Sequence, residues 1–175
     1  CSSDLLGERG DPARRDADDA GSQAFERTVD ALESLPLPSV ARLNGSVYGG
    51  ATDLALACDF RVGVTGMELR MPAARLGLHY YPGGLRRFVE RLGPGAAKRL
   101  FLLGEAVDDR VLQATGYLDL LVGADGLDAA VASIVRALAA GAPLALRGMK
   151  ASIDELAGGR ADPQALRQRV AACAA

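Results

Sequence analysis

Residues 35–62, LPLPSVARLNGSVYGGATDLALACDFRV, form the stretch of sequence that decides the fold. Within it, residues 39–43 have the pattern of a short strand, and Asn44-Gly45 is a turn signal. The apolar run 52–58 opens with Thr-Asp, which is typical of the N-terminus of a helix. Residues 59–64 then predict a second strand. Short strands that alternate with helices indicate an α/β protein.

The segments on either side of this stretch extend the same alternation. Apolar residues at helical spacing predict an amphipathic helix over 23–35, which Pro36 and Pro38 end. The preceding residues 7–22 are polar and rich in Gly, Asp and Arg, which predicts a mobile loop. On the C-terminal side the sequence predicts a strand at 67–71, a loop at 72–84 and two helical stretches within 85–103, which are broken at residues 93–95. A helix at 106–115 and a strand at 117–122 are predicted next. Helices at 126–140 and 143–156 and a last helix from Pro163 complete the prediction.

Length and composition limit the kind of protein that this sequence encodes. The chain of 175 residues is long enough for one domain with a hydrophobic core. Its net charge of −2 implies no general attraction to nucleic acid or to an anionic membrane. No apolar stretch reaches the roughly 20 residues needed to span a bilayer. The polar start CSSD is also unlike a secretory leader.

The cysteines of the chain argue against a metal site. There are three, without CxxC spacing, and only one histidine accompanies them. A sparse, odd set of cysteines is typical of free thiols in a reducing compartment, which predicts a cytoplasmic protein. Cys58 lies in an apolar run, so we interpret it as a small buried hydrophobe rather than a nucleophile.

Several spaced motifs follow one another in an order that is known from one family. The stretch 35–62 passes from a proline-ended helix through a strand, Asn-Gly and a glycine pair to a helix that runs into Ala-Cys-Asp. Residues 72–87 (PAARLGLHYYPGGLRR) and 99–122, with Leu-x-Gly-Glu and a Tyr/Leu-rich strand, continue the likeness, and residues 1–5 (CSSDL) precede it. Together these motifs resemble the crotonase superfamily of enoyl-CoA hydratases and isomerases.

The resemblance implies an α/β fold of the crotonase type, which is a spiral of ββα turns, with the N-terminal strands of the family missing. It implies a core over residues 1–140, incomplete at its N-terminus, and a C-terminal helical segment over 141–175. The expected partner is an acyl-CoA small molecule, and the expected assembly is a homotrimer or hexamer. No tightly bound cofactor is expected, because coenzyme A arrives as part of the thioester substrate.

The resemblance further implies an oxyanion site made of two backbone N–H groups. Such donors stabilise a thioester enolate, and removing one typically costs roughly 3–4 kcal/mol. One donor falls at Gly50, where the dipole of the following helix favours negative charge, and the other falls at Cys1. Coenzyme A binding is assigned to the neighbouring Ser2, Ser3, Asp4 and Leu5. The alternative for Gly49-Gly50 is a tight turn with no ligand.

Two carboxylates are implied for hydration in this family, one that orients water and one that transfers the α-proton. The first position falls at Asp53 and the second at Ala73, which has no group that transfers a proton. These residues therefore disfavour ordinary hydratase activity. Asp53 has an equally weighted alternative, as a carboxylate in the first turn of a helix, where the dipole favours it.

The segment His79-Tyr80-Tyr81 lies where the family varies its catalytic residues. Tyr80 matches a tyrosine that a malonyl-type decarboxylase branch uses to place the departing carboxylate. Loss of CO₂ makes the enolate without a general base, which is compatible with Ala73, and His79 is able to protonate the enolate near neutral pH. Alternatively, all three are half-buried loop residues that pack under the trimer contact. We favour packing for His79 and catalysis for Tyr80.

Three hypotheses for function follow from these residues and from the resemblance. The favoured one is an acyl-CoA-processing enzyme that stabilises a thioester enolate, with the character of a decarboxylase-like lyase. The second is a catalytically inactive homologue that binds acyl-CoA or serves as an oligomer partner. The third is a hydrolase of a thioester or β-diketone that uses His79.

Overall fold

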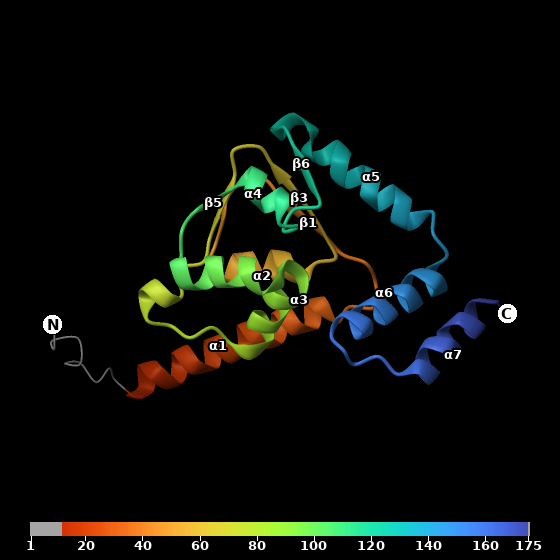
Figure 1. Ribbon diagram of the computed structural model, residues 1–175, viewed down its shortest axis with the longest axis horizontal. Helices are drawn as coiled ribbons and strands as arrows, with labels where there is room; N and C mark the ends of the chain where they lie inside the picture. Colours follow the sequence, from red (N-terminus) through yellow and green to blue (C-terminus); the bar gives the residue numbers. More distant parts are fainter. Residues whose placement is uncertain (1–11, 175) are drawn as a thin grey trace.

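The computed structural model describes residues 12–174 and contains the expected short strands and helices (Figure 1). The strands are β1 (Val40–Leu43), β2 (Val47–Tyr48), β3 (Phe60–Val64), β4 (Glu68–Arg70), β5 (Val107–Asp108) and β6 (Leu120–Val122). The α-helices are α1 (Pro12–Glu33), α2 (Gly50–Ala57), α3 (Pro82–Lys98), α4 (Asp109–Ala114), α5 (Leu127–Ala139), α6 (Pro143–Ala157) and α7 (Pro163–Ala174). Short helical turns are η1 (Ala74–Leu76), η2 (Arg99–Leu103) and η3 (Ala124–Gly126).

The strands form two three-stranded sheets, and the chain passes from one to the other in each turn. The first sheet has the order β1-β3-β6, with all strands parallel and Val40 opposite Phe60. The second has the order β2-β4-β5, in which β2 runs parallel to β4 and β5 runs antiparallel, with Leu69 opposite Val107. The units β1-β2-α2 and β3-β4-α3 therefore repeat one ββα pattern, which makes the chain a spiral.

Helix α1 begins earlier than the sequence predicts. The prediction of a loop up to residue 22 was wrong for residues 12–22, which are helical. Proline is favoured at the first position of a helix, as Pro12 is here, and the alanines and arginines that follow it have high helix propensity. The C-terminal half of α1 packs against α2 and α3 through a face that includes the fully buried Val29.

Other boundaries differ from the predictions for local reasons. Helix α3 begins at Pro82, inside the predicted loop, again with proline at the first position. The predicted break is confirmed, because Gly93 has φ 80° and ψ 162° inside the continuous ribbon of α3. Strands β2 and β5 have two residues each, which is too short to give an alternating sequence pattern.

The core lies between the sheets and the helices α2 and α3. Its fully buried side chains come from strands, helices and connecting turns: Leu56, Val62, Leu69, Phe88 and Tyr117. The Tyr117 hydroxyl donates to the Thr52 carbonyl at 2.8 Å, which satisfies the polar end of a buried ring. This hydrogen bond ties the N-terminal turn of helix α2 to the segment that precedes β6.

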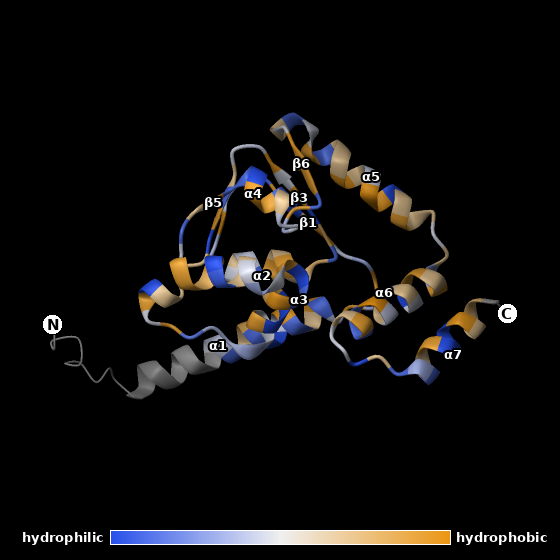
Figure 2. Cartoon of the chain, in the orientation of Figure 1, coloured by the Kyte–Doolittle hydropathy of each residue, from blue (hydrophilic) through white to orange (hydrophobic). Residues whose placement is uncertain are grey.

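Of the C-terminal helices, α5 packs against the β1-β3-β6 sheet, whereas α6 and α7 extend away from the sheets (Figure 1). Figure 2 shows apolar and polar residues interspersed along them, and α6 exposes the large apolar side chains of Leu144, Met149, Ile153 and Leu156. Among residues 12–174 no single helix is long and apolar enough to cross a membrane. The segments Ala124–Ala139 and Pro143–Ala157, bent by 106°, reach that length and apolarity only when taken together.

Candidate active site

Two glycines with different roles form the turn between β2 and α2. Gly49 has φ 54° and ψ −127°, a backbone conformation that favours glycine. Its N–H donates to the Arg70 carbonyl at 2.9 Å, and its carbonyl accepts from the Thr52 hydroxyl at 2.7 Å. These bonds fix the position at which Gly50 begins α2.

The N–H of Gly50 is the first amide of α2. The first amides of a helix have no intrahelical acceptor, and no other described residue accepts a hydrogen bond from this N–H. The helix dipole adds partial positive charge at this end. The geometry is therefore compatible with an oxyanion donor, and the catalytic assignment of Gly50 stays a prediction.

Position 50 has no room for a side chain. A Cβ atom built on Gly50 would lie 2.9 Å from Cζ of Phe25, which reaches across from α1. The Phe25 ring also meets the Tyr81 ring edge to face, with 6.2 Å between their centroids. An aromatic ring of α1 therefore closes the Cα side of Gly50.

Asp53, in the first turn of α2, is fully buried and has donors at both carboxylate oxygens. Arg87 Nη1 lies 2.6 Å from Oδ1. The Tyr80 hydroxyl donates to Oδ2 at 3.1 Å, and the Tyr81 hydroxyl donates to the same oxygen. A carboxylate closed off from solvent and held by three donors does not fit the predicted role of orienting a water. In this structure Asp53 is a counter-ion and hydrogen-bond acceptor.

Arg87 of α3 is fully buried and joins three helices through its charge. Besides Asp53 of α2, it meets two acids of α1: its Nη2 lies 2.8 Å from Asp30 Oδ1 and 3.2 Å from Glu33 Oε2. Its Nε lies 3.1 Å from Glu33 Oε1 without hydrogen-bond geometry, so that contact is ionic only. Burial opposes the charged form, but the bonds to Glu33 and Asp53 outweigh it and raise the pKa of Arg87.

The rings of Tyr80 and Tyr81 form an aromatic wall beside Asp53. Their centroids are 4.8 Å apart, and the Tyr80 ring lies 5.1 Å from that of Phe101. Burial raises the pKa of Tyr80, and the negative charge of Asp53 raises it further. Burial and the hydrogen bond to Asp53 likewise raise the pKa of Tyr81. Both phenols therefore remain protonated donors, half-buried as the packing alternative predicted.

Gly84, in the first turn of α3, makes room for this wall. A Cβ atom at position 84 would overlap Cε1 of Tyr80 and lie 2.8 Å from Oδ2 of Asp53. No other residue type leaves both groups in place. The glycine pair at 83–84 thus has a packing function that the sequence motif alone does not indicate.

Replacing Gly84 by alanine is expected to destabilise the fold by about 1–3 kcal/mol, because the new methyl group overlaps Tyr80 and Asp53. Gly95→Ala is a matched control in the same helix, where a Cβ atom meets nothing within 4 Å. That control is expected to gain about 0.5–1 kcal/mol from lower chain entropy. Urea denaturation of both variants measures the difference, and equal stabilities would contradict the close packing at position 84.

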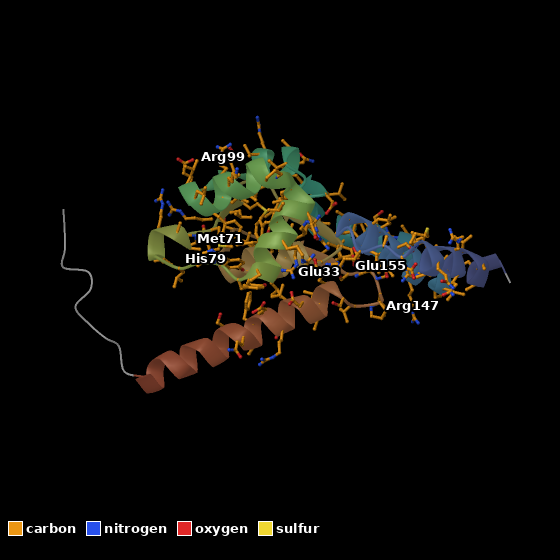
Figure 3. All side chains as sticks on the ribbon, turned by 60° about the horizontal axis from the view of Figure 1, so that its bottom comes forward. Glu33, Met71, His79, Arg99, Arg147 and Glu155 are labelled. Atoms are coloured by element: carbon orange, nitrogen blue, oxygen red, sulfur yellow. The ribbon has the colours of Figure 1, made fainter. Side chains whose placement is uncertain are left out.

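The remaining residues that the sequence predicted as sites lie outside the Asp53 cluster. His79 is exposed in the loop that precedes α3 (Figure 3), and its Nδ1 lies 2.8 Å from the Tyr80 carbonyl oxygen. The packing role favoured for His79, under a trimer contact, stays a prediction, because the exposure is that of a single chain. Ala73 is buried just before η1. The predicted sites Cys1 and Ser2, Ser3, Asp4 and Leu5 lie outside the described residues.

Glu33, labelled near the end of α1 in Figure 3, makes the stability of this cluster depend on pH. Burial raises the pKa of Glu33, but bonds from Arg87 and Arg86 outweigh it and lower the pKa below 4.5. The unfolded chain then binds the proton more readily than the folded one. The stability that Glu33 contributes is present above about pH 4.5 and is lost as pH falls through the lower, folded-state pKa.

Glu33→Gln is therefore expected to be less stable than the wild type at neutral pH, and the difference should shrink on acidification below about pH 4.5. Urea midpoints at a series of pH values measure this convergence. Glu26→Gln, on a half-exposed position of α1, is the control. A constant difference across the series would show that Glu33 does not titrate with folding.

The most connected residue of the cluster, Arg87, was not predicted as part of a site. The structure places Arg87 in the core with no exposed surface. The available signal was the position of Arg87 next to Phe88 on the apolar side of an amphipathic helix. Cys58, in contrast, is buried as predicted, and burial raises the pKa of its thiol.

The sequence matches known proteins over most of its length. The pattern of the enoyl-CoA hydratase/isomerase family matches residues 6–173. YngF of Bacillus subtilis, whose name places it with the enoyl-CoA hydratases/isomerases, is 31% identical over 131 residues, which are 75% of this chain and 50% of that protein. The enoyl-CoA isomerase/hydratase fer4 of Mycosarcoma maydis is 30% identical over 132 residues, 75% of this chain and 48% of that protein.

Solved structures agree with the sequence matches. An enoyl-CoA hydratase/isomerase family protein from Hyphomonas neptunium superposes with a TM-score of 0.86 at 28% identity, covering 100% of this chain and 68% of that one. Enoyl-CoA hydratase from Bacillus anthracis gives 0.78 at 27% identity, covering 94% and 61%. These matches confirm the crotonase-type spiral. The chain spans about half the length of the curated relatives that it matches, and it belongs to the enoyl-CoA hydratase/isomerase family.

Proposed function

We propose that this chain is part of an enzyme that acts on acyl-CoA thioesters and stabilises a thioester enolate with the Gly50 amide. Two features support the proposal: the Gly50 N–H has no acceptor among the described residues, and it begins a helix. Preorganised N–H donors stabilise an oxyanion without reorganising during the reaction. Coenzyme A enters as part of the substrate in this proposal, and a trimeric or hexameric assembly and a cytoplasmic location stay predictions.

The reaction that fits these residues best is a decarboxylase-like lyase reaction. One observation carries this choice: neither carboxylate position has a carboxylate that is free to move a proton. Position 73 is a buried alanine, and Asp53 is held by Arg87 and two tyrosines. Hydration needs such a group, because water must be deprotonated and the α-carbon protonated. Loss of CO₂ from a malonyl-type thioester needs neither step to form the enolate.

In the proposed reaction, the bond between the α-carbon and the substrate carboxylate breaks. Its electron pair forms the enolate, whose oxygen accepts from the Gly50 N–H, and CO₂ leaves. One proton, from solvent or from the exposed His79, then forms the new bond at the α-carbon. The hydroxyl proton of Tyr80 is already donated to Asp53, so Tyr80 contributes its ring. An apolar wall disfavours an ionised carboxylate and thereby favours its loss.

The full-length protein should be assayed side by side with methylmalonyl-CoA and crotonyl-CoA. The proposal expects CO₂ release from the first to be faster than hydration of the second. Faster turnover of crotonyl-CoA would overturn the decarboxylase assignment. Tyr80→Phe tests the role of the ring: activity close to that of the wild type is expected, and a large loss would show that the hydroxyl itself holds the substrate carboxylate.

An inactive acyl-CoA-binding homologue is the second candidate, and the same two carboxylate positions favour it. The two candidates differ in turnover. Micromolar binding of an acyl-CoA without product from malonyl-type, enoyl or hydrolysable thioesters would select the inactive homologue. Oxygen from labelled water in a released acid would instead select the hydrolase that uses His79.

A further inference from the structure

A buried charge network that the proposed reaction does not use centres on Arg87. Arg87 of α3 faces Asp53 of α2 on one side and Asp30 and Glu33 of α1 on the other. Arg87 and Asp53 have no exposed surface, whereas Asp30 is half-exposed. A single guanidinium thus fixes three helices relative to one another, and two of these helices meet at Gly50.

A continuous series of contacts runs from this network to Gly50. Arg87 holds the Asp53 carboxylate, and Asp53 accepts the hydroxyl of Tyr81. The Tyr81 ring meets the Phe25 ring edge to face, and Phe25 lies against the Cα side of Gly50. The links from Arg87 to Phe25 are contacts between side chains, and in the last link the Phe25 ring fills the space that a side chain at position 50 would need. A shift of Asp53 would therefore be transmitted to the surface beside the Gly50 amide.

We propose that Arg87 is a positioning residue, which holds Asp53 as a fixed acceptor so that Tyr81 and Phe25 shape the surface beside the Gly50 amide. Asp53 is then a structural anion at a position where the family resemblance implies an acid that orients water. This inference rests on the proposed function, because the surface that Arg87 positions adjoins the proposed Gly50 donor.

The geometry of the guanidinium explains why arginine is required. Its planar fork directs Nη1 to Asp53 and Nη2 to Asp30 at the same time. A lysine has one compact charge and does not span acids on two helices. Arg86, its neighbour, provides a matched comparison. It shares Glu33 and pairs with Glu90, but it makes none of the described contacts to Asp53.

The test uses the full-length protein and the double variant Arg87→Met with Asp53→Asn, because removing both charges leaves no buried charge uncompensated. Arg86→Met is the control. The first readout is the NMR signals of ¹³C-labelled tyrosine, assigned with Tyr80→Phe and Tyr81→Phe. The second is kcat and KM for methylmalonyl-CoA. A misplacement of about 1 Å caused by a distant change can cost about 10²-fold.

If Arg87 positions Asp53 and Tyr81, the folded double variant is expected to have shifted Tyr81 signals. Its kcat should be about 10²-fold lower, with a smaller change in KM. The control should alter neither readout. Unshifted Tyr81 signals would overturn the proposal, and so would shifted signals with a kcat within about threefold of the wild type. If the wild type turns over no thioester, the proposed function fails. The tyrosine signals then still decide whether Arg87 orders this wall.

Discussion

Replacing Gly50 by proline is expected to lower turnover of the thioester substrate about 10²–10³-fold, the typical effect of removing one oxyanion donor. Proline has no N–H, so the variant deletes the proposed donor itself. Proline is also well tolerated at the first position of a helix, which is where Gly50 lies in α2. The change therefore acts on the proposed chemistry more than on the helix.

Gly50→Ala is the matched control for this experiment. Its Cβ atom meets Phe25 at 2.9 Å, as the proline ring does, but its N–H is retained. The alanine variant should lose less activity than the proline variant. Steady-state kinetics on folded variants, with folding checked by circular dichroism, give the comparison. Equal losses in the alanine and proline variants would mean that the N–H is not a donor in the reaction.

Arg87→Met alone is expected to destabilise the protein by about 3–5 kcal/mol. Removing one partner of a buried ion pair leaves the other charge uncompensated, and here the stranded charge is Asp53, which has no exposed surface. Asp53→Asn in the same background should restore much of the loss, since a neutral amide replaces the buried anion. Urea denaturation of the single and double variants measures the coupling between the two positions.

Arg86→Met again provides the comparison, because its two ion pairs, with Glu33 and Glu90, are partly exposed. Exposed pairs typically contribute about 0–1 kcal/mol. Arg86→Met and Arg87→Met remove the same side-chain type from adjacent positions of one helix. Similar losses of stability in both would contradict the assignment of Arg87 as the buried centre of the network.

The Arg87 and Asp53 variants also test whether the charge of Asp53 takes part in the reaction. A buried aspartate fixed by Arg87 and two tyrosines differs from a carboxylate that is poised to exchange protons. If Arg87 is needed for Tyr81 geometry but Asp53→Asn alone keeps activity, the negative charge at position 53 has no chemical role. The reaction would then depend on the Gly50 amide and on the shape of the aromatic wall.

The order of elements and the family could both be predicted from the sequence, because the signals are local. Asn44-Gly45 and Gly49-Gly50 set backbone turns that few other residues permit, and apolar periodicity indicates helices through side chains three and four residues apart. Strand 40–43, helix α2 and the break at Gly93 were predicted in this way. The helix over residues 12–22 was missed because it has no clear apolar face in the sequence, although its propensity is high.

The sequence by itself determined that Gly50 begins a helix after a glycine turn and that position 73 has no acid. Only the tertiary structure decided what Asp53 does. Its donor Arg87 lies 34 residues further along the chain, and Arg87 in turn pairs with Asp30 at a separation of 57 residues. The role of a buried charge depends on the groups that replace its water, and the packing of three helices chooses those groups.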